Sequence, residues 1–142
     1  NTQLWIVLFD IEDNGHLPGW DWILGSQYFA EHMSAKPDAV INLDMVGDEN
    51  LQIFPESTSK KELTEQIWNL AKAMGYEKYF STSRTHGIID DHTPFLNKGF
   101  SAVDIIDIDF PYYHTLQDDL THVSSSSLGI VGSLIEKWVE DN

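Results

Sequence analysis

The chain has 142 residues, of which 23 are acidic and eight are basic, so its formal net charge is −15. This length suits one domain with enough residues for an apolar core. Nucleic acids and anionic membrane surfaces are excluded as partners, because they need a field of the opposite sign. The acid excess fits either cation binding or simply a soluble acidic surface. There is no cysteine, so a metal site would have to use imidazole and carboxylate ligands.

The chain opens on five consecutive apolar residues, Leu4 to Leu8. Their branched and aromatic side chains predict a strand that is buried on both faces. No run is long enough for a membrane span, and no signal-peptide pattern is visible. A core strand only three residues from Asn1, with no initiator Met, indicates a fragment of a longer polypeptide.

An acidic turn follows this strand directly, in the sequence Phe9-Asp10-Ile11-Glu12-Asp13-Asn14-Gly15. Open α/β sheets bind ligands beyond the carboxyl ends of their strands. Neighbouring carboxylates repel one another and lose hydration when buried, so such a cluster needs a cation or shared protons. The alternative is an ordinary acidic surface turn between a strand and a helix.

Several elements are predicted in the first half of the chain. A helix should run from about Trp20 to Met33, and Gly25-Ser26 within it suggests close packing at that point. Strands are predicted at 39–44, which ends on Asp44, and at 51–54. The sequence Ser59-Lys60-Lys61-Glu62 has the form of a capping box. The helix after it should bury one apolar stripe and stop at Gly75: Leu63, Ile67, Leu70, Ala71 and Met74.

The second half continues the alternation of helices and strands. Asp90-Asp91-His92-Thr93-Pro94-Phe95 is a further acidic cluster in which His92 or Thr93 can open a short helix. A strand is predicted at 102–106, and a last helix is marked by apolar residues from Leu128 to Trp138. The alternation predicts an α/β fold with a mostly parallel or mixed central sheet flanked by helices. Polar groups at four strand ends would then share one edge: Glu12-Asp13, Asp44, Asp90-Asp91 and His114.

Taken in order, these motifs resemble the zinc aminopeptidase family that also contains the glutaminyl cyclases. The resemblance covers nearly the whole chain and rests on the acidic turn, Trp20, Gly25-Ser26, Asn42-Leu43-Asp44-Met45-Val46-Gly47, Asp90 to Phe95 with Gly99, and Tyr113-His114-Thr115 with Asp118. The family usually has Gly where Ile11 stands. The resemblance implies a zinc-exopeptidase-like fold, one or two zinc ions and a peptide substrate, in proteins that are often secreted or periplasmic.

The resemblance also implies roles for individual residues. Glu12 matches the general base, and Asp13 and His114 match two ligands of one metal. Asp44 matches a ligand of a second metal in two-zinc members, or part of a hydrogen-bond network in the cyclases. Asp90 matches the carboxylate of that network. Such a constellation is chemically sound, because zinc accepts imidazole and carboxylate ligands and a free carboxylate can take a proton from metal-bound water.

Further residues have a substrate-pocket interpretation and a plainer one. Asp91 is an uncertain neighbour of Asp90, and four aromatic residues can wall an apolar pocket or simply pack in the core: Trp20, Phe110, Tyr112 and Tyr113. Among the other histidines, His92 is expected at a helix start. The remaining four are expected in loops or on the surface: His16, His32, His86 and His122.

One departure from the family is serious. The family's first His ligand and its bridging Asp precede the acidic turn, in a part that this chain lacks. Residues 1–142 are therefore interpreted as a single domain, the carboxyl-terminal portion of a zinc-exopeptidase-like catalytic domain without its amino-terminal strands. The missing amino-terminal part of the same polypeptide is its expected partner. The fragment alone is expected to bind zinc weakly and to be inactive.

Three functions remain open at this stage. The first is a zinc aminopeptidase, which the 42–47 motif favours. The second is a glutaminyl cyclase, an acyltransferase that closes an amino-terminal Gln into pyroglutamate. The third is a binding domain without catalysis, against which the retention of Glu12, Asp13, Asp44 and His114 argues.

Overall fold

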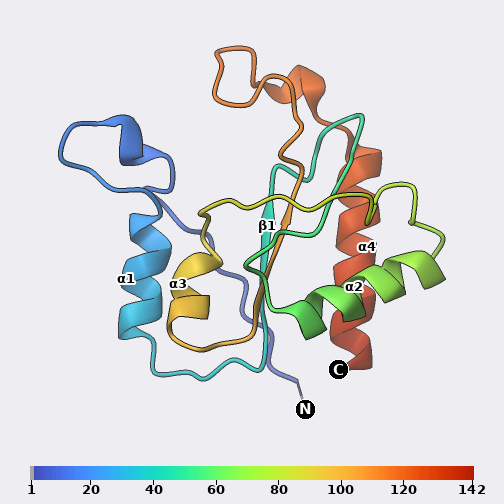
Figure 1. Cartoon of the computed structure of the whole chain (residues 1–142), viewed down its shortest axis with the longest axis horizontal. Coiled ribbons are helices and arrows are strands. Elements are labelled where there is room, and N and C mark those ends of the chain that lie inside the picture. Colours follow the sequence, from blue (N-terminus) through green and yellow to red (C-terminus); the bar gives the residue numbers. More distant parts are fainter. Residues whose placement is uncertain (1) are drawn as a thin grey trace.

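A computed structural model describes residues 2–142 and has a mixed α/β architecture (Figure 1). Two parallel strands, β1 (Val40–Asp44) and β2 (Ala102–Ile106), lie between two groups of helices. Helices α1 (Leu24–His32) and α3 (Thr93–Asn97) are on one side, and α2 (Lys61–Ala73) and α4 (Ser125–Asp141) are on the other. Two short 3-10 turns, η1 (Asn14–His16) and η2 (Leu120–His122), lie in the connecting loops. The predicted fold class is confirmed.

The register of the two strands places their carboxyl ends at one edge. Val40 pairs with Ala102, and Asp44 pairs with Ile106. Every residue of β2 is buried, as expected of a parallel strand that is covered on both faces. The loop after β1 and the loop after β2 therefore leave the sheet at the same edge, on which the candidate site is built.

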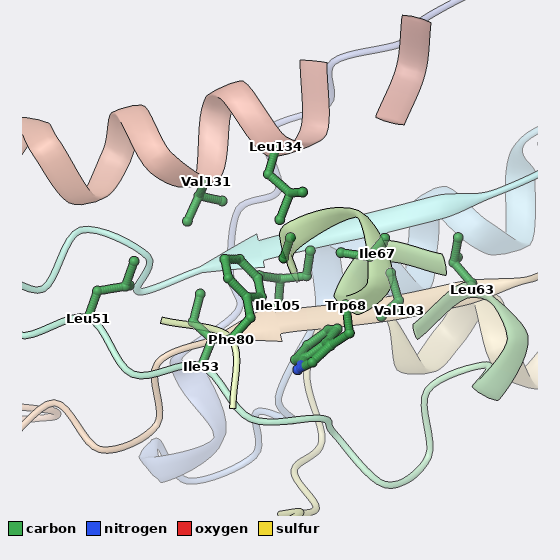
Figure 2. Close-up of a cluster of buried hydrophobic side chains, with 11 residues drawn as sticks. Leu51, Ile53, Leu63, Ile67, Trp68, Phe80, Val103, Ile105, Val131 and Leu134 are labelled. Atoms are coloured by element: carbon green, nitrogen blue, oxygen red, sulfur yellow. The ribbon is translucent and has the colours of Figure 1, made fainter. Parts of the chain in front are cut away.

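The main core lies between the sheet, α2 and α4 (Figure 2). The stripe predicted on α2 is confirmed, because Leu63, Ile67 and Ala71 are almost fully buried while Leu70 and Met74 pack at the margin of this core. On α4, Val131 and Leu134 face the same core. Gly75 ends α2 with a φ of 77°, a left-handed conformation that favours glycine.

A smaller core on the other side of the sheet fixes the segment that leads into the acidic turn. Ala30, Phe95 and Ala102 form its buried centre. The Phe9 ring packs against it, with ring centroids 5.6 Å from Phe29 and 6.0 Å from Phe95. Phe9 therefore anchors the chain immediately before Asp10.

The predicted buried strand over Leu4–Leu8 is wrong for this structure. The segment is not a strand, and its side chains are exposed, with 83% of Ile6 and 92% of Leu8 accessible. A strand needs a neighbouring backbone to satisfy its amides and carbonyls, and no segment within residues 2–142 pairs with this one. The strand predicted at 51–54 is reduced to one isolated bridge between Ile53 and Phe80.

Two helix starts also differ from the prediction. The capping box is wrong, because the Ser59 hydroxyl donates to Glu56 and accepts from the Asp104 N–H, both at 3.0 Å. Helix α2 begins at Lys61 without a side-chain cap. Helix α1 begins at Leu24 rather than near Trp20, because Ile23 has a φ of 54° and breaks the helical path. Over the residues described, no helix has the length and apolar character needed to cross a membrane.

Candidate active site

The predicted acids and His114 meet beyond the carboxyl ends of β1 and β2. The Asp13 Oδ1 atom lies 2.9 Å from Nε2 of His114, which joins the turn before α1 to the loop after β2. The pKa of Glu12 is raised by burial and then by repulsion from four other acids, which lie close enough to Glu12 to act on it: Asp13, Asp90, Asp44 and Asp91. The predicted convergence is therefore present in the structure.

Aromatic rings surround the Asp13–His114 pair. The His114 ring stacks on Tyr113 with centroids 3.8 Å apart, and it lies nearly parallel to Trp22 at 6.0 Å. His16, in η1, makes an edge contact with both Trp22 and His114. These rings restrict the orientation of the imidazole, while about a third of the His114 side chain stays accessible.

The start of α1 holds the acidic turn in place. The Ile23 N–H donates to the Glu12 carbonyl at 2.9 Å, and the Leu24 N–H donates to the Ile11 carbonyl at 3.2 Å. Gly25 allows this approach, since a Cβ there would lie 2.3 Å from the Asp10 carbonyl oxygen. The close packing predicted from Gly25 is confirmed.

Backbone strain is concentrated beside the candidate site residues. Ile11, Met45 and His114 have φ values of 55°, 51° and 57°. Left-handed backbone costs a residue with a Cβ roughly 1–2 kcal/mol, and a β-branched residue such as Ile11 rarely adopts it. This conformation gives a physical reason for the glycine that the resembled family carries at the Ile11 position.

Burial and mutual repulsion perturb the acids of the site. Burial, with added repulsion from Asp13 and Asp90, raises the pKa of Glu12 to about 7. Burial, with added repulsion from Asp90, raises the pKa of Asp44 to about 6. A carboxylate whose pKa lies near neutrality is suited to accept and return a proton in catalysis.

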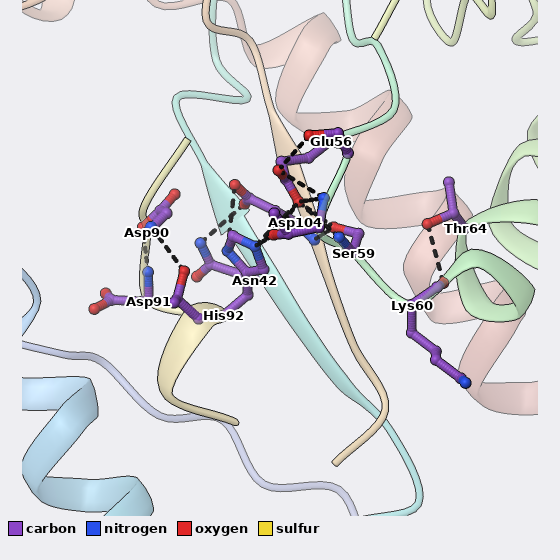
Figure 3. A network of polar contacts seen from close by, with 12 residues as sticks. Asn42, Glu56, Ser59, Lys60, Thr64, Asp90, Asp91, His92 and Asp104 are labelled. Carbon is purple, nitrogen blue, oxygen red and sulfur yellow. Dashed lines mark hydrogen bonds and ion pairs between the residues drawn. The ribbon is translucent and has the colours of Figure 1, made fainter. Parts of the chain in front are cut away.

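Asp90 and Asp91 form a tight turn before α3 (Figure 3). The Asp91 N–H donates to Asp90 Oδ1 at 2.5 Å, and Asp90 is only 3% exposed. Its other oxygen, Oδ2, is buried without a hydrogen-bond partner. Burial also raises the pKa of Asp91. Asp90 thus keeps one carboxylate oxygen free within the acid cluster.

The predicted aromatic pocket is only partly formed. Tyr113 contacts His114, whereas Tyr112 stacks on His122 at 3.8 Å and Phe110 packs edge-on against Tyr112. Trp20 is 48% exposed, and Trp22 takes the place beside His114 instead. A helix from Trp20 would include Trp22, but α1 starts at Leu24, so Trp22 lies in the turn before the helix and reaches His114.

The donor set fits zinc in kind but is incomplete in number. Two ligands of a tetrahedral zinc, at bond lengths of about 2.0–2.1 Å, lie about 3.3 Å apart, close to the observed Asp13–His114 separation of 2.9 Å. Within residues 2–142, however, no three His, Asp or Glu side chains are grouped so that they could hold a metal ion. Asp44 joins the acid cluster without completing a third ligand position.

Comparison with known proteins agrees with this geometry. The family model described as Peptidase family M28 matches residues 1–139. Aminopeptidase YwaD of Bacillus subtilis is 29% identical over 95% of this chain, and the Bos taurus glutaminyl-peptide cyclotransferase is 25% identical over 98%. A crystal structure of a Zn-dependent exopeptidase from Parabacteroides distasonis superposes with a TM-score of 0.83 and 27% identity over 94% of this chain.

The fold and the site thus define a class of protein in which a parallel sheet between helices carries acids and an imidazole at its carboxyl edge. The chain belongs to peptidase family M28. It spans only part of its relatives: 31% of the aminopeptidase, 46% of the cyclotransferase and 53% of the exopeptidase structure.

Proposed function

We propose that this chain is part of a zinc-dependent aminopeptidase that hydrolyses amino-terminal peptide bonds. The observation that carries the proposal is the Asp13–His114 contact beside Glu12, a carboxyl group with a pKa of about 7. Asp13 and His114 would hold the metal, and Glu12 would act as the general base. Membership of peptidase family M28 and the similarity to an aminopeptidase support this assignment.

Each residue of the proposed site would have a separate role in the reaction. A bound zinc ion would lower the pKa of a coordinated water to near ~7. The Glu12 carboxylate would accept a proton from that water and deliver it to the leaving amine. Asp44 and Asp90 would contribute negative charge that attracts the substrate's amino group. Tyr113 and Trp22 would wall the space next to His114.

We further propose that a segment outside these residues supplies the remaining metal ligands. Two contacting ligands are fewer than a catalytic zinc site requires, and the relatives are two to three times as long as the part matched here. The 142-residue chain alone should therefore bind zinc weakly and show no turnover. Zinc dependence and activity belong to the full-length polypeptide.

A glutaminyl cyclase is the second candidate, and one observation favours it. A crystal structure of a glutaminyl cyclase from an Acidobacteriales bacterium superposes with a TM-score of 0.85 and 29% identity over 93% of this chain. The similarity to the Bos taurus glutaminyl-peptide cyclotransferase supports it as well.

One experiment separates these functions. The full-length polypeptide, loaded with zinc, is assayed on a panel of aminoacyl anilides and on a Gln-initiated peptide, with the bound zinc counted. Anilide hydrolysis that is lost in Glu12→Gln and kept in Glu62→Gln supports the aminopeptidase. Pyroglutamate formation with one zinc per chain supports the cyclase instead. Absence of both reactions in a zinc-loaded, folded protein contradicts both proposed activities and favours a binding domain without catalysis.

A further inference from the structure

His92 lies at the centre of a buried polar cluster behind the candidate site (Figure 3). Its side chain is completely inaccessible. On one side its Nε2 atom lies 3.2 Å from Glu56 Oε2 and 3.1 Å from Thr58 Oγ1. On the other side its Nδ1 atom lies 3.6 Å from Asp104 Oδ2. The ring therefore bridges the loop before α2 and the middle of β2.

Glu56 is surrounded by hydrogen-bond donors. Its carboxylate accepts from the N–H groups of Thr58 and Ser59 and from both of their hydroxyls. Burial alone would raise the pKa of Glu56, but the hydrogen bonds from His92, Thr58 and Ser59 outweigh burial and hold it well below its usual range. Because the Thr58 hydroxyl gives its proton to Glu56, its oxygen can only accept from Nε2. Both neighbours of Nε2 thus require an Nε2–H donor.

The opposite nitrogen faces a different carboxyl group. Asp104 Oδ1 accepts from Asn42 at 3.0 Å, while Asp104 Oδ2 and His92 Nδ1 are both buried without a hydrogen-bond partner. Burial, with added repulsion from Asp90, raises the pKa of Asp104 to about 9, so this carboxyl group keeps its proton at neutral pH. A protonated Oδ2 is a donor, and an unprotonated Nδ1 is the acceptor that it faces.

The backbone of His92 connects this cluster to Asp90. His92 is the N-cap of α3, and its carbonyl accepts from the N–H groups of Phe95 and Leu96 at 3.2 Å. The Thr93 N–H donates to the Asp90 carbonyl at 2.8 Å. The turn that carries Asp90 is therefore attached to the sheet through the buried His92 ring.

We propose that His92, held as the Nε2–H tautomer between Glu56 and Asp104, is a positioning residue that fixes Asp90 in the candidate active site. The tautomer and the fixed turn are properties of this chain. The effect on turnover rests on the proposed function, and it is tested separately.

The first test is an NMR measurement on the full-length polypeptide with labelled histidine. At neutral pH, the ring signal that disappears in His92→Gln should show a protonated Nε2 and an unprotonated Nδ1. The Asp91 amide, which donates to Asp90, should shift upfield in His92→Ala and stay in place in the matched surface variant His32→Ala. An Nδ1–H tautomer, rapid exchange between tautomers or an unmoved Asp91 amide overturns the proposal.

The second test measures kinetics in the full-length, zinc-loaded polypeptide. Glu56→Gln keeps the shape of the side chain, and it should lower kcat by about 10- to 100-fold with zinc content unchanged, the range seen for supporting residues of metal sites. His92→Gln, which restores a donor toward Glu56, should retain more kcat than His92→Ala. Equal kcat in wild type and folded His92→Ala overturns the positioning role. A wild type without either activity refutes the proposed function, while the NMR result still decides the tautomer and the turn.

Discussion

Asp13 and His114 lie in contact, 2.9 Å from Oδ1 to Nε2, although one follows the first apolar segment and the other follows the last strand. The contact exists because Phe9 and the start of α1 hold the acidic turn in place, while the loop after β2 carries His114 to the same edge of the sheet. The imidazole stacks on Tyr113 and lies nearly parallel to Trp22. The pair is therefore built by the fold as a whole and not by a local motif.

Replacing Ile11 by Gly should stabilise the chain. Ile11 has a φ of 55°, and removing its Cβ relieves roughly 1 kcal/mol of left-handed strain. Chemical denaturation of Ile11→Gly should show this gain in the free energy of unfolding. Ile89→Gly, at an exposed position without positive φ, should show no gain. A loss of stability in Ile11→Gly would show that the isoleucine side chain contributes more by packing than the strain costs.

Raising the pH should destabilise the chain through Asp104. Its pKa is about 9 in the folded chain and near the ordinary value of 3.8 in the unfolded chain, so the folded state holds a proton that the unfolded state has released. The free energy of unfolding should then fall with pH between these values, by up to about 1.4 kcal/mol per pH unit. The raised pKa values of Asp44 and Glu12 also make the free energy of unfolding fall with pH, but only up to about pH 6 for Asp44 and about pH 7 for Glu12.

Asp104→Asn should therefore remove the decline that remains above about pH 7, because the amide does not ionise. Thermal denaturation at a series of pH values measures this slope. Asp118→Asn, in an exposed loop, is the matched control and should leave the slope as in wild type. A wild-type slope in Asp104→Asn above neutrality would refute the assignment of the proton to Asp104.

Truncating Glu56 should be strongly destabilising. Glu56→Ala leaves His92, Thr58 and Ser59 as buried donors without their acceptor, and each buried donor left unsatisfied costs about 1–3 kcal/mol. Glu62→Ala removes an exposed glutamate paired with Lys60 and should leave the free energy of unfolding nearly unchanged. Urea denaturation of the two variants gives the comparison. Equal costs would show that the Glu56 cluster does not hold the fold together.

Leu134 should dominate the packing of α4 on the main core. It is fully buried beside α2 and the sheet, so Leu134→Ala should cost about 2–5 kcal/mol of stability. Leu128, on the same helix, is 46% exposed, and Leu128→Ala should cost about 1 kcal/mol or less. The difference between the two free energies of unfolding tests the placement of α4. A Leu128→Ala cost as large as that of Leu134→Ala would contradict it.

The sequence predicts those elements of the fold that follow from local residue patterns and from the parallel arrangement of the strands. The stripe on α2, the strands β1 and β2 and the short helix at Thr93 all follow from periodicity and turn residues. The meeting of Asp13 with His114 follows from the family resemblance instead, because the strand predicted before Asp13 does not form. Leu4–Leu8 reads as a strand, yet strand formation depends on a partner backbone that no local pattern reports. The stacking of Trp22 depends on where α1 begins, which a left-handed Ile23 decides.

The Glu56–His92–Asp104 cluster also could not be predicted from the sequence. Glu56 precedes a helix and looks like a solvated acid, and the Ser59-x-x-Glu62 pattern directs Ser59 to the wrong partner. Only the tertiary structure shows that Ser59 instead bonds Glu56 and the Asp104 amide. His92 was expected at a helix start, which the structure confirms, but its buried neighbours come from distant segments.

Metal analysis of the full-length polypeptide tests the central claim most directly. Wild type, Asp13→Asn, His114→Gln and the surface control His32→Gln are dialysed against zinc and their bound zinc is measured. We expect bound zinc in wild type and in His32→Gln. In Asp13→Asn and in His114→Gln we expect loss of the zinc ion that Asp13 and His114 share. Zinc content that is unchanged in folded Asp13→Asn and His114→Gln would show that this pair binds no metal and would contradict the account.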